Sequence, residues 1–186
     1  MKITQTLYVS NREAWRDWLE EHSTTEKEIW LVYYRKQTGH RRIAYNDAVE
    51  EALCFGWIDS TVKGLDAERF AQKFSPRKPG SAYSQANKER LRRLIEQDKV
   101  MKDVLTTLGE CFAEEFAIPP DILQAIKTNE QAWQNLQRYS EPYQRIRIAF
   151  IDGARNRPEE FRKRLKHFIR MTEKNKQFGF GIETYF

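Results

Sequence analysis

Residues 28–36 read EIWLVYYRK, and this stretch decides the fold class. Six consecutive side chains in it are apolar or aromatic. An extended segment of this composition needs cover on both of its faces, which is the situation of a central strand in a sheet. The stretch therefore predicts a strand that is buried on both faces.

A hairpin is predicted farther along the chain. Residues 57–63 and 68–74 have strand-like composition, and residues 64–66, GLD, form a turn between them. Together with residues 6–10, TLYVS, these segments predict a small, mostly antiparallel sheet of three to four strands.

Helical patterns surround the sheet and continue to the end of the chain. Ser10 and Glu13 form a capping-box pattern before the first helix, and from Ser84 onward only helical patterns occur. We therefore expect an α+β fold. Its core covers residues 1–115 and is packed with helices, and a helical C-terminal region over residues 116–186 packs on that core.

The positive charge of the chain is unevenly placed. The chain has 186 residues and a formal net charge of +5, and residues 141–186 carry 11 Lys and Arg against 6 Asp and Glu. A basic surface attracts nucleic acid, acidic lipid or small phosphorylated ligands, although a solvated helix face gives the same pattern. No apolar run reaches the ~20 residues of a membrane span, and the N-terminus has no signal-peptide pattern. We expect a cytoplasmic protein, whose oligomeric state the sequence leaves open.

A basic amphipathic helix is predicted near the C-terminus. Its apolar stripe consists of Phe161, Leu165, Phe168 and Ile169. We expect this stripe to pack on the rest of the protein and the basic face to be solvated. The alternative is a nucleic-acid-binding module that uses the basic face and requires Arg162 and Arg164.

The motifs of several common chemistries are missing. His22, His40 and His167 have no partner at metal-ligand spacing, and the sequence contains no phosphate-binding loop, dinucleotide fingerprint or serine-hydrolase elbow. We therefore expect neither a metal nor a cofactor, and no catalytic residue is assigned. An enzyme without a recognised motif remains a further alternative, with Asp59 as its acid or base.

Two cysteines, Cys54 and Cys111, lie far apart without a CxxC spacing, which favours a reduced protein. Cys54 falls near the predicted end of a helix, where the helix dipole disfavours a thiolate. A buried structural cysteine and a reactive thiol both remain open for this residue.

Trp57 and Asp59 alternate on the first hairpin strand and share one face of the sheet. A carboxylate with apolar neighbours needs a partner. Asp59 either pairs with a cation such as Arg77 or Lys36, or lines a pocket that has Trp57 as its stacking floor.

Residues 74–87, FSPRKPGSAYSQAN, combine prolines, serines and basic residues before a helix. The prolines stiffen the chain, and Ser81 or Ser84 can cap the helix. The free N–H groups of a helix N-terminus favour anions, and the forked guanidinium of Arg77 matches phosphate or carboxylate. The stretch is therefore either a rigid loop with a helix cap or an anion site.

Several stretches resemble the YdeI/OmpD-associated family, also labelled bacteriocin-protection proteins. They are ALCFGWIDS, FSPRKPGSAYSQAN, WLVYYRK, YNDAVEEAL and, more weakly, FIDGARNRPEEFRKRL. Tyr83 departs from the pattern, because many relatives have tryptophan there, and RPEEFRKR replaces an E-T-R-type sequence. The resemblance implies a role in stress or in tolerance of antimicrobial peptides, and it brings no defined reaction, substrate or cofactor.

The leading hypothesis is a protein that binds a small anionic or phosphorylated ligand between the sheet and the helix that follows Ser84. In this hypothesis cations supply charge, hydroxyl and amide groups supply hydrogen bonds, and an indole forms a flat wall. The assigned residues are Trp57, Asp59, Arg77, Lys78, Ser81, Ser84 and Asn87.

Overall fold

A computed structural model describes residues 2–112 and 116–186. The chain divides into two compact units. The sheet unit comprises Met1–Ala82 and Arg90–Cys111, and the helical unit comprises Tyr83–Glu89 and Phe112–Phe186. The domain boundary predicted after residue 115 lies at the edge of residues 113–115, which are outside the described residues, and it stays a prediction.

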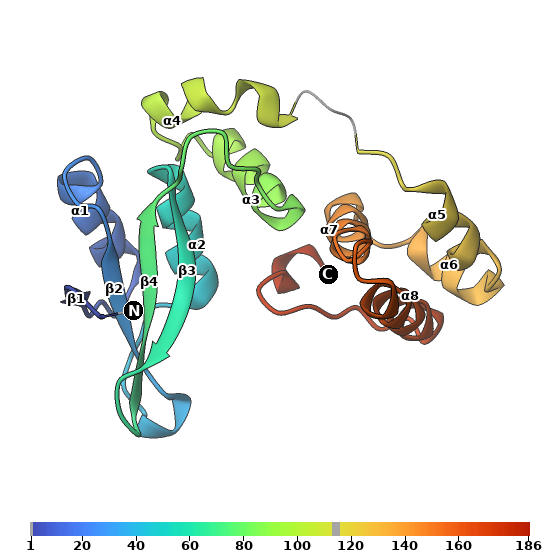
Figure 1. Ribbon diagram of the computed structural model, residues 1–186, viewed down its shortest axis with the longest axis horizontal. Helices are drawn as coiled ribbons and strands as arrows, with labels where there is room; N and C mark the ends of the chain where they lie inside the picture. The colour runs from blue at the N-terminus through green and yellow to red at the C-terminus, as the bar shows by residue number, and fades with distance from the viewer. Residues whose placement is uncertain (1, 113–115) are drawn as a thin grey trace. The chain divides into compact units, whose positions relative to one another are not determined.

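The sheet unit contains a four-stranded sheet in the order β1-β2-β4-β3 (Figure 1). The strands are β1 (Thr6–Leu7), β2 (Ile29–Tyr34), β3 (Trp57–Gly64) and β4 (Arg69–Pro76). β1 is parallel to β2, and the other two pairs are antiparallel. The predicted α+β class, the central strand and the hairpin are all confirmed, and the first five residues of β2 are buried.

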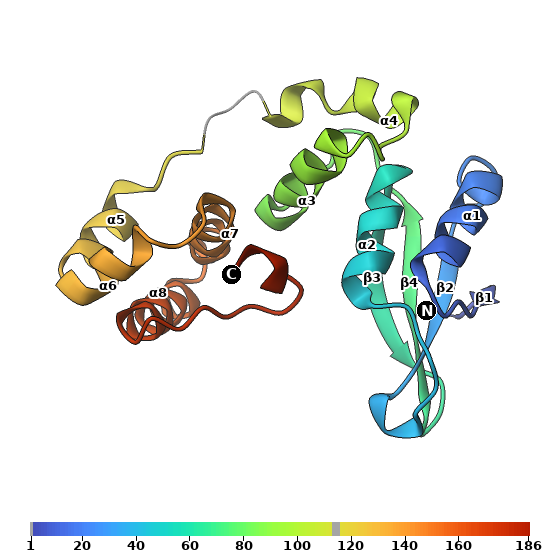
Figure 2. The same cartoon turned by 180° about the vertical axis from the view of Figure 1, so that it is seen from behind.

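Two helices cover the same face of this sheet. They are α1 (Arg12–His22) and α2 (Tyr45–Cys54). The ring of Trp15 on α1 packs edge-on against Phe74, and Tyr45 on α2 donates a hydrogen bond to Asp59. Asp59 and Phe74 are direct partners across β3 and β4, so they share one face. Figure 2 views the unit from the side on which α1 and α2 lie.

The start of α1 differs from the prediction. Asn11, in an extended conformation, is the N-cap, and its side-chain oxygen accepts a hydrogen bond from the backbone N–H of Ala14 at 2.8 Å. The predicted capping box at Ser10 is therefore wrong by one residue. Asparagine and serine are equally good caps, so the pattern alone did not separate the two positions.

Two further helices follow the sheet, α3 (Gln85–Glu96) and α4 (Lys102–Thr107). Residues of α3 up to Glu89 group with the helical unit, and those from Arg90 onward group with the sheet unit. None of the helices in the described part of the chain combines the length and the apolar character that crossing a membrane requires.

The helical unit is built from four helices around one apolar core (Figure 1). They are α5 (Pro120–Lys127), α6 (Glu130–Leu136), α7 (Glu141–Asp152) and α8 (Pro158–Glu173). Phe168 of α8 is buried in this core, and Phe161, Leu165 and Ile169 pack against it. The prediction that the apolar stripe of the basic helix packs on the protein is confirmed.

The C-terminal segment, residues 174–186, docks on α7. The hydroxyl of Tyr143 accepts a hydrogen bond from the backbone N–H of Phe178 at 3.1 Å. The hydroxyl of Ser140 donates to the carbonyl of Tyr185, and Ile182 is buried in the core of the unit. Glycines at positions 179 and 181 have positive φ angles and turn this segment.

Candidate functional site

The loop around Arg77 is held together by its own hydrogen bonds. One terminal nitrogen of the guanidinium donates to the carbonyls of Ser81 and Ala82, at 2.9 and 3.0 Å. The hydroxyl of Ser81 donates to the carbonyl of Lys78 at 2.7 Å. These bonds fit the interpretation of the stretch as a rigid loop, and the role of Arg77 toward an anion stays a prediction.

The predicted site residues fall in both units of the chain. Ser84 and Asn87 belong to the helical unit, and the other five belong to the sheet unit. The hydroxyl of Ser84 accepts a hydrogen bond from the backbone N–H of Asn87 at 3.3 Å, so Ser84 caps α3 as predicted. The grouping of all seven residues around one ligand stays a prediction.

Trp57 lies in the core of the sheet unit. Its side chain is 1% exposed, and its indole N–H donates to the carbonyl of Ser23 at 3.1 Å. Its ring also packs edge-on against Trp18. The expectation that Trp57 forms an open wall for a ligand is therefore wrong, because α1 and the residue that follows it cover the indole.

Asp59 takes part in a polar cluster on the same face of the sheet. Its carboxylate accepts hydrogen bonds from the hydroxyl of Tyr45 at 3.1 Å and from the amide of Gln72 at 2.7 Å. Burial and the Asp59 charge raise the pKa of Tyr45 to about 12, so this phenol stays protonated and keeps donating. Within the described residues no cation pairs with Asp59, so the expected partners Arg77 and Lys36 are wrong.

Ion pairs join α1 to α2 in the same unit. Glu51, which is 2% exposed, binds the guanidinium groups of Arg12 and Arg16. Burial and the Glu51 charge raise the pKa of the nearby Cys54 thiol to about 11. Cys54 is therefore protonated at neutral pH, which favours the structural interpretation of this cysteine over a reactive thiol. No group of His, Cys, Asp and Glu side chains suited to a metal ion occurs in the described ranges.

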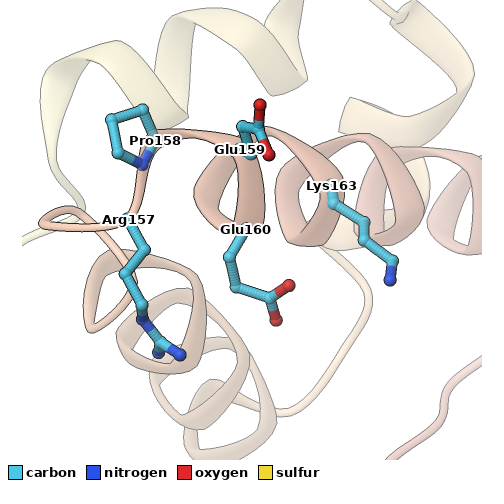
Figure 3. Close-up of a pocket in the computed structure, with 5 residues that line it drawn as sticks. All are labelled: Arg157, Pro158, Glu159, Glu160 and Lys163. Carbon is cyan, nitrogen blue, oxygen red and sulfur yellow. The ribbon is translucent and has the colours of Figure 1, made fainter.

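Two depressions lie on α8 of the helical unit. The first, of about 450 Å³, surrounds the helix start and is lined by Arg157, Pro158, Glu159, Glu160 and Lys163. In Figure 3 the side chains of Arg157, Glu160 and Lys163 extend to the same side of the chain. Glu159 and Glu160 occupy the first turn, so acidic side chains already meet the positive end of the helix dipole and an anion is disfavoured there.

The second depression is a shallow groove of about 490 Å³ along α8. Its lining residues are Arg162, Leu165, Lys166, Ile169, Arg170 and Glu173. The floor is apolar and the rim is mainly basic, but no polar group within it is buried without a partner. Neither depression therefore shows the features of a built site.

An arginine on the buried face of α7 does show such features. Tyr143, Arg147 and Ile151 follow one another at intervals of four residues and share one face of the helix. Tyr143 and Ile151 are fully buried, and Arg147 is only 8% exposed. Sequence reasoning missed this residue, although a charged residue on an apolar helical stripe was a usable signal.

The guanidinium of Arg147 finds no hydrogen-bond acceptor among the described residues, and its Nε is fully buried. Its Cζ lies 4.0 Å from the ring centroid of Phe178 and 5.0 Å from that of Phe150. Burial lowers the pKa of Arg147, and the charge of Arg164 lowers it further. A buried cation without a carboxylate partner is unfavourable, so this position favours the arrival of an anion.

The C-terminal segment lies directly against this guanidinium. A Cβ atom added to Gly179 would come within 3.5 Å of a terminal nitrogen of Arg147 and within 2.5 Å of the Ile182 side chain. The φ angle of Gly179 is +145°, a backbone conformation that residues other than glycine rarely adopt. Glycine at this position therefore allows this backbone angle and the close packing on Ile182 beside the arginine.

Comparison with protein families gives two matches. Residues 7–107 match a family described as a domain of unknown function (DUF8412), and this span contains the GWIDS and SPRKPGS segments. Residues 115–175 match the family described as bacteriocin-protection, YdeI or OmpD-associated, and this span contains Arg147 and all of α8. No curated protein and no solved structure matches the chain. The chain therefore belongs to the DUF8412 family, and the match of residues 115–175 to the bacteriocin-protection, YdeI or OmpD-associated family supports the resemblance found in the sequence.

Proposed function

We propose that the protein binds a small anionic ligand and that the guanidinium of Arg147 pairs with the negatively charged group of that ligand. The observation that carries the proposal is the burial of this guanidinium without an acceptor among the described residues. An unpaired buried donor costs about 1–3 kcal/mol. The buried guanidinium lowers the stability of the free protein, and a bound anion would stabilise it. Such an arrangement is typical of a binding site rather than of a core.

The stacking of Arg147 on aromatic rings supports the same function. The rings of Phe178 and Phe150 lie close to the guanidinium and offer it no hydrogen-bond acceptor, and a planar fork binds carboxylate or phosphate with two parallel hydrogen bonds. Phe150 is 46% exposed, so the site lies near the surface of the helical unit. The family name supports a context of stress or antimicrobial tolerance, and we propose that binding takes place in the cytoplasm.

The test is thermal unfolding of the full chain with about 10 mM sulfate, compared with chloride at matched ionic strength. At ten times the dissociation constant, sulfate should stabilise the wild type by about 1.4 kcal/mol, which raises its Tm by roughly 3–5 °C. Arg147→Met should abolish this shift. Arg162→Met, which removes an exposed arginine of α8, should leave it unchanged.

A third variant separates this site from the loop at residues 74–87. If Arg77→Ala abolishes the response to sulfate and Arg147→Met does not, the anion site is the loop and the proposal for Arg147 is wrong. An equal response in all four proteins, or no response in the wild type, also contradicts the proposal. The alternatives of a nucleic-acid-binding module and an enzyme stay predictions.

A further inference from the structure

Arg147 is not the only cation near its two aromatic rings. The Cζ of Arg164 lies 3.8 Å from the centroid of Phe150, the ring that Arg147 also approaches. Arg164 belongs to α8 and Arg147 to α7, so guanidinium groups from two helices lie against the same ring. The charge of Arg164 lowers the pKa of Arg147, so the two like charges repel, and an anion that contacts both groups is more favourable than one that contacts either alone.

Two more basic groups lie near the second ring, that of Phe178. The imidazole of His167 packs edge-on against it at 4.8 Å, and a terminal nitrogen of Arg170 lies 3.0 Å from Nδ1 of His167. Burial lowers the pKa of His167, and the charges of Arg170 and Arg147 lower it further. The imidazole is therefore mainly neutral at pH 7, and the positive charge near this ring comes from the arginines.

The acidic groups near this cluster do not balance it. Glu160 accepts a hydrogen bond from Nε of Arg164 at 2.7 Å, and Nη1 of Arg164 donates to the carbonyl of Phe150 at 2.7 Å, so Nη2 is the nitrogen that Arg164 can offer to a ligand. Arg147 and Arg170 form no ion pair with a carboxylate in the described part of the chain. Three arginines and one glutamate leave an excess of two positive charges. A phosphate monoester above its second pKa of about 6 carries nearly two negative charges.

We propose that the anionic group of the ligand is a phosphate monoester dianion, bound by Arg147 and Arg164 at the packed faces of α7 and α8. This inference rests on the proposed function, because it names the ligand class of the same site. Gly179 lies beside one terminal nitrogen of Arg147. The exposed ring of Phe150 offers an apolar surface to the organic part of the ester.

The test compares phenyl phosphate with phenyl sulfate by titration calorimetry at pH 7.5 with the full chain. The two probes have the same shape, but phenyl sulfate carries one negative charge and phenyl phosphate nearly two. We expect phenyl phosphate to bind at least about tenfold more tightly, because the second charge is met by Arg164. Arg147→Met should abolish the binding of both probes.

Variants of Arg164 test whether this residue binds the second negative charge of phenyl phosphate. Arg164→Gln should keep the binding of phenyl sulfate and reduce the preference for phenyl phosphate to less than about threefold. Arg164→Lys keeps the positive charge and should keep most of the preference for phenyl phosphate over phenyl sulfate. This result would show that the loss of preference in Arg164→Gln comes from the lost charge and not from a loss of folding. Arg162→Gln, an exposed neighbour on α8, should change neither value.

The outcomes separate this inference from the proposed function. If both probes bind equally and both need Arg147, the anion site stands and the dianion inference is wrong. If Arg164→Gln leaves a tenfold preference unchanged, Arg164 does not meet the second charge and the inference is again wrong. If the wild type binds neither phenyl phosphate nor phenyl sulfate, the proposed function and this inference both fail.

Discussion

Replacing Arg147 by methionine should stabilise the protein in the absence of a ligand. Arginine leaves a buried Nε without an acceptor, which costs about 1–3 kcal/mol, and its stacking on Phe178 and Phe150 returns about 0.5–2 kcal/mol. Methionine has a similar length and no group to desolvate. We therefore expect the free energy of unfolding to rise by about 1 kcal/mol and the Tm by about 2–4 °C.

A second arginine of α7 provides the matched control. Arg145 forms two hydrogen bonds, of 2.8 and 3.0 Å, to the carboxylate of Glu89, which is 3% exposed. Removing Arg145 takes two charge-assisted hydrogen bonds from this buried carboxylate, and each is worth about 1.5–3 kcal/mol. Arg145→Met should therefore destabilise the protein, although it lies only two residues from Arg147 and changes the same residue type.

The assay is urea denaturation of the wild type and both variants in chloride buffer, without phosphate or sulfate. The reasoning predicts opposite signs for the two variants. A loss of more than about 2 kcal/mol in Arg147→Met would refute it, because a loss of that size means that the guanidinium is hydrogen-bonded in the free protein. Arg147 would then be a structural residue.

Three further predictions concern other parts of the chain. Glu51→Gln should cost about 3–5 kcal/mol in urea denaturation because Arg12 and Arg16 lose the buried carboxylate that they share, whereas Glu20→Gln, at an exposed partner of Arg16, should cost less than about 0.5 kcal/mol. Gly179→Ala should release the C-terminal segment, because its Cβ would lie 2.5 Å from the Ile182 side chain at a φ of +145°; unchanged resistance to limited proteolysis would contradict this. The pKa of His167 is lowered from its ordinary value of 6.5, so the unfolded chain binds a proton first as the pH falls. Stability should therefore decrease on acidification from about pH 6.5 through the folded pKa, and His167→Gln should flatten the plot of Tm against pH; identical plots for both proteins would show the reasoning to be wrong.

The elements of the sheet could be predicted because their signals are local. The two-sided apolar run of β2 and the turn between β3 and β4 each lie within a few residues, and both are confirmed. The start of α1 was wrong by one residue because Ser10 and Asn11 are adjacent and both can cap a helix. Only the backbone conformation decides between two such neighbours.

The candidate site was harder to predict because it depends on contacts between distant residues. Trp57 looked like a ligand wall until α1, more than thirty residues earlier, proved to cover it. Arg147 was counted only as one of the 11 Lys and Arg of residues 141–186. Its burial depends on Phe178, which lies beyond α8 in the sequence. Its spacing from Tyr143 is the one local sign of that environment.

The most direct test of the central claim observes the Arg147 guanidinium itself. In a ¹H–¹⁵N spectrum of the full chain, its Nε–H signal can be assigned by its absence in Arg147→Met. Because this Nε is buried, exchange of its proton with water should be slow enough for detection. We predict that the signal shifts saturably when phenyl phosphate is added and that it shifts in the same way in the Arg162→Gln variant. A signal of Arg147 that stays unchanged at a concentration of phenyl phosphate that saturates the protein would contradict the account.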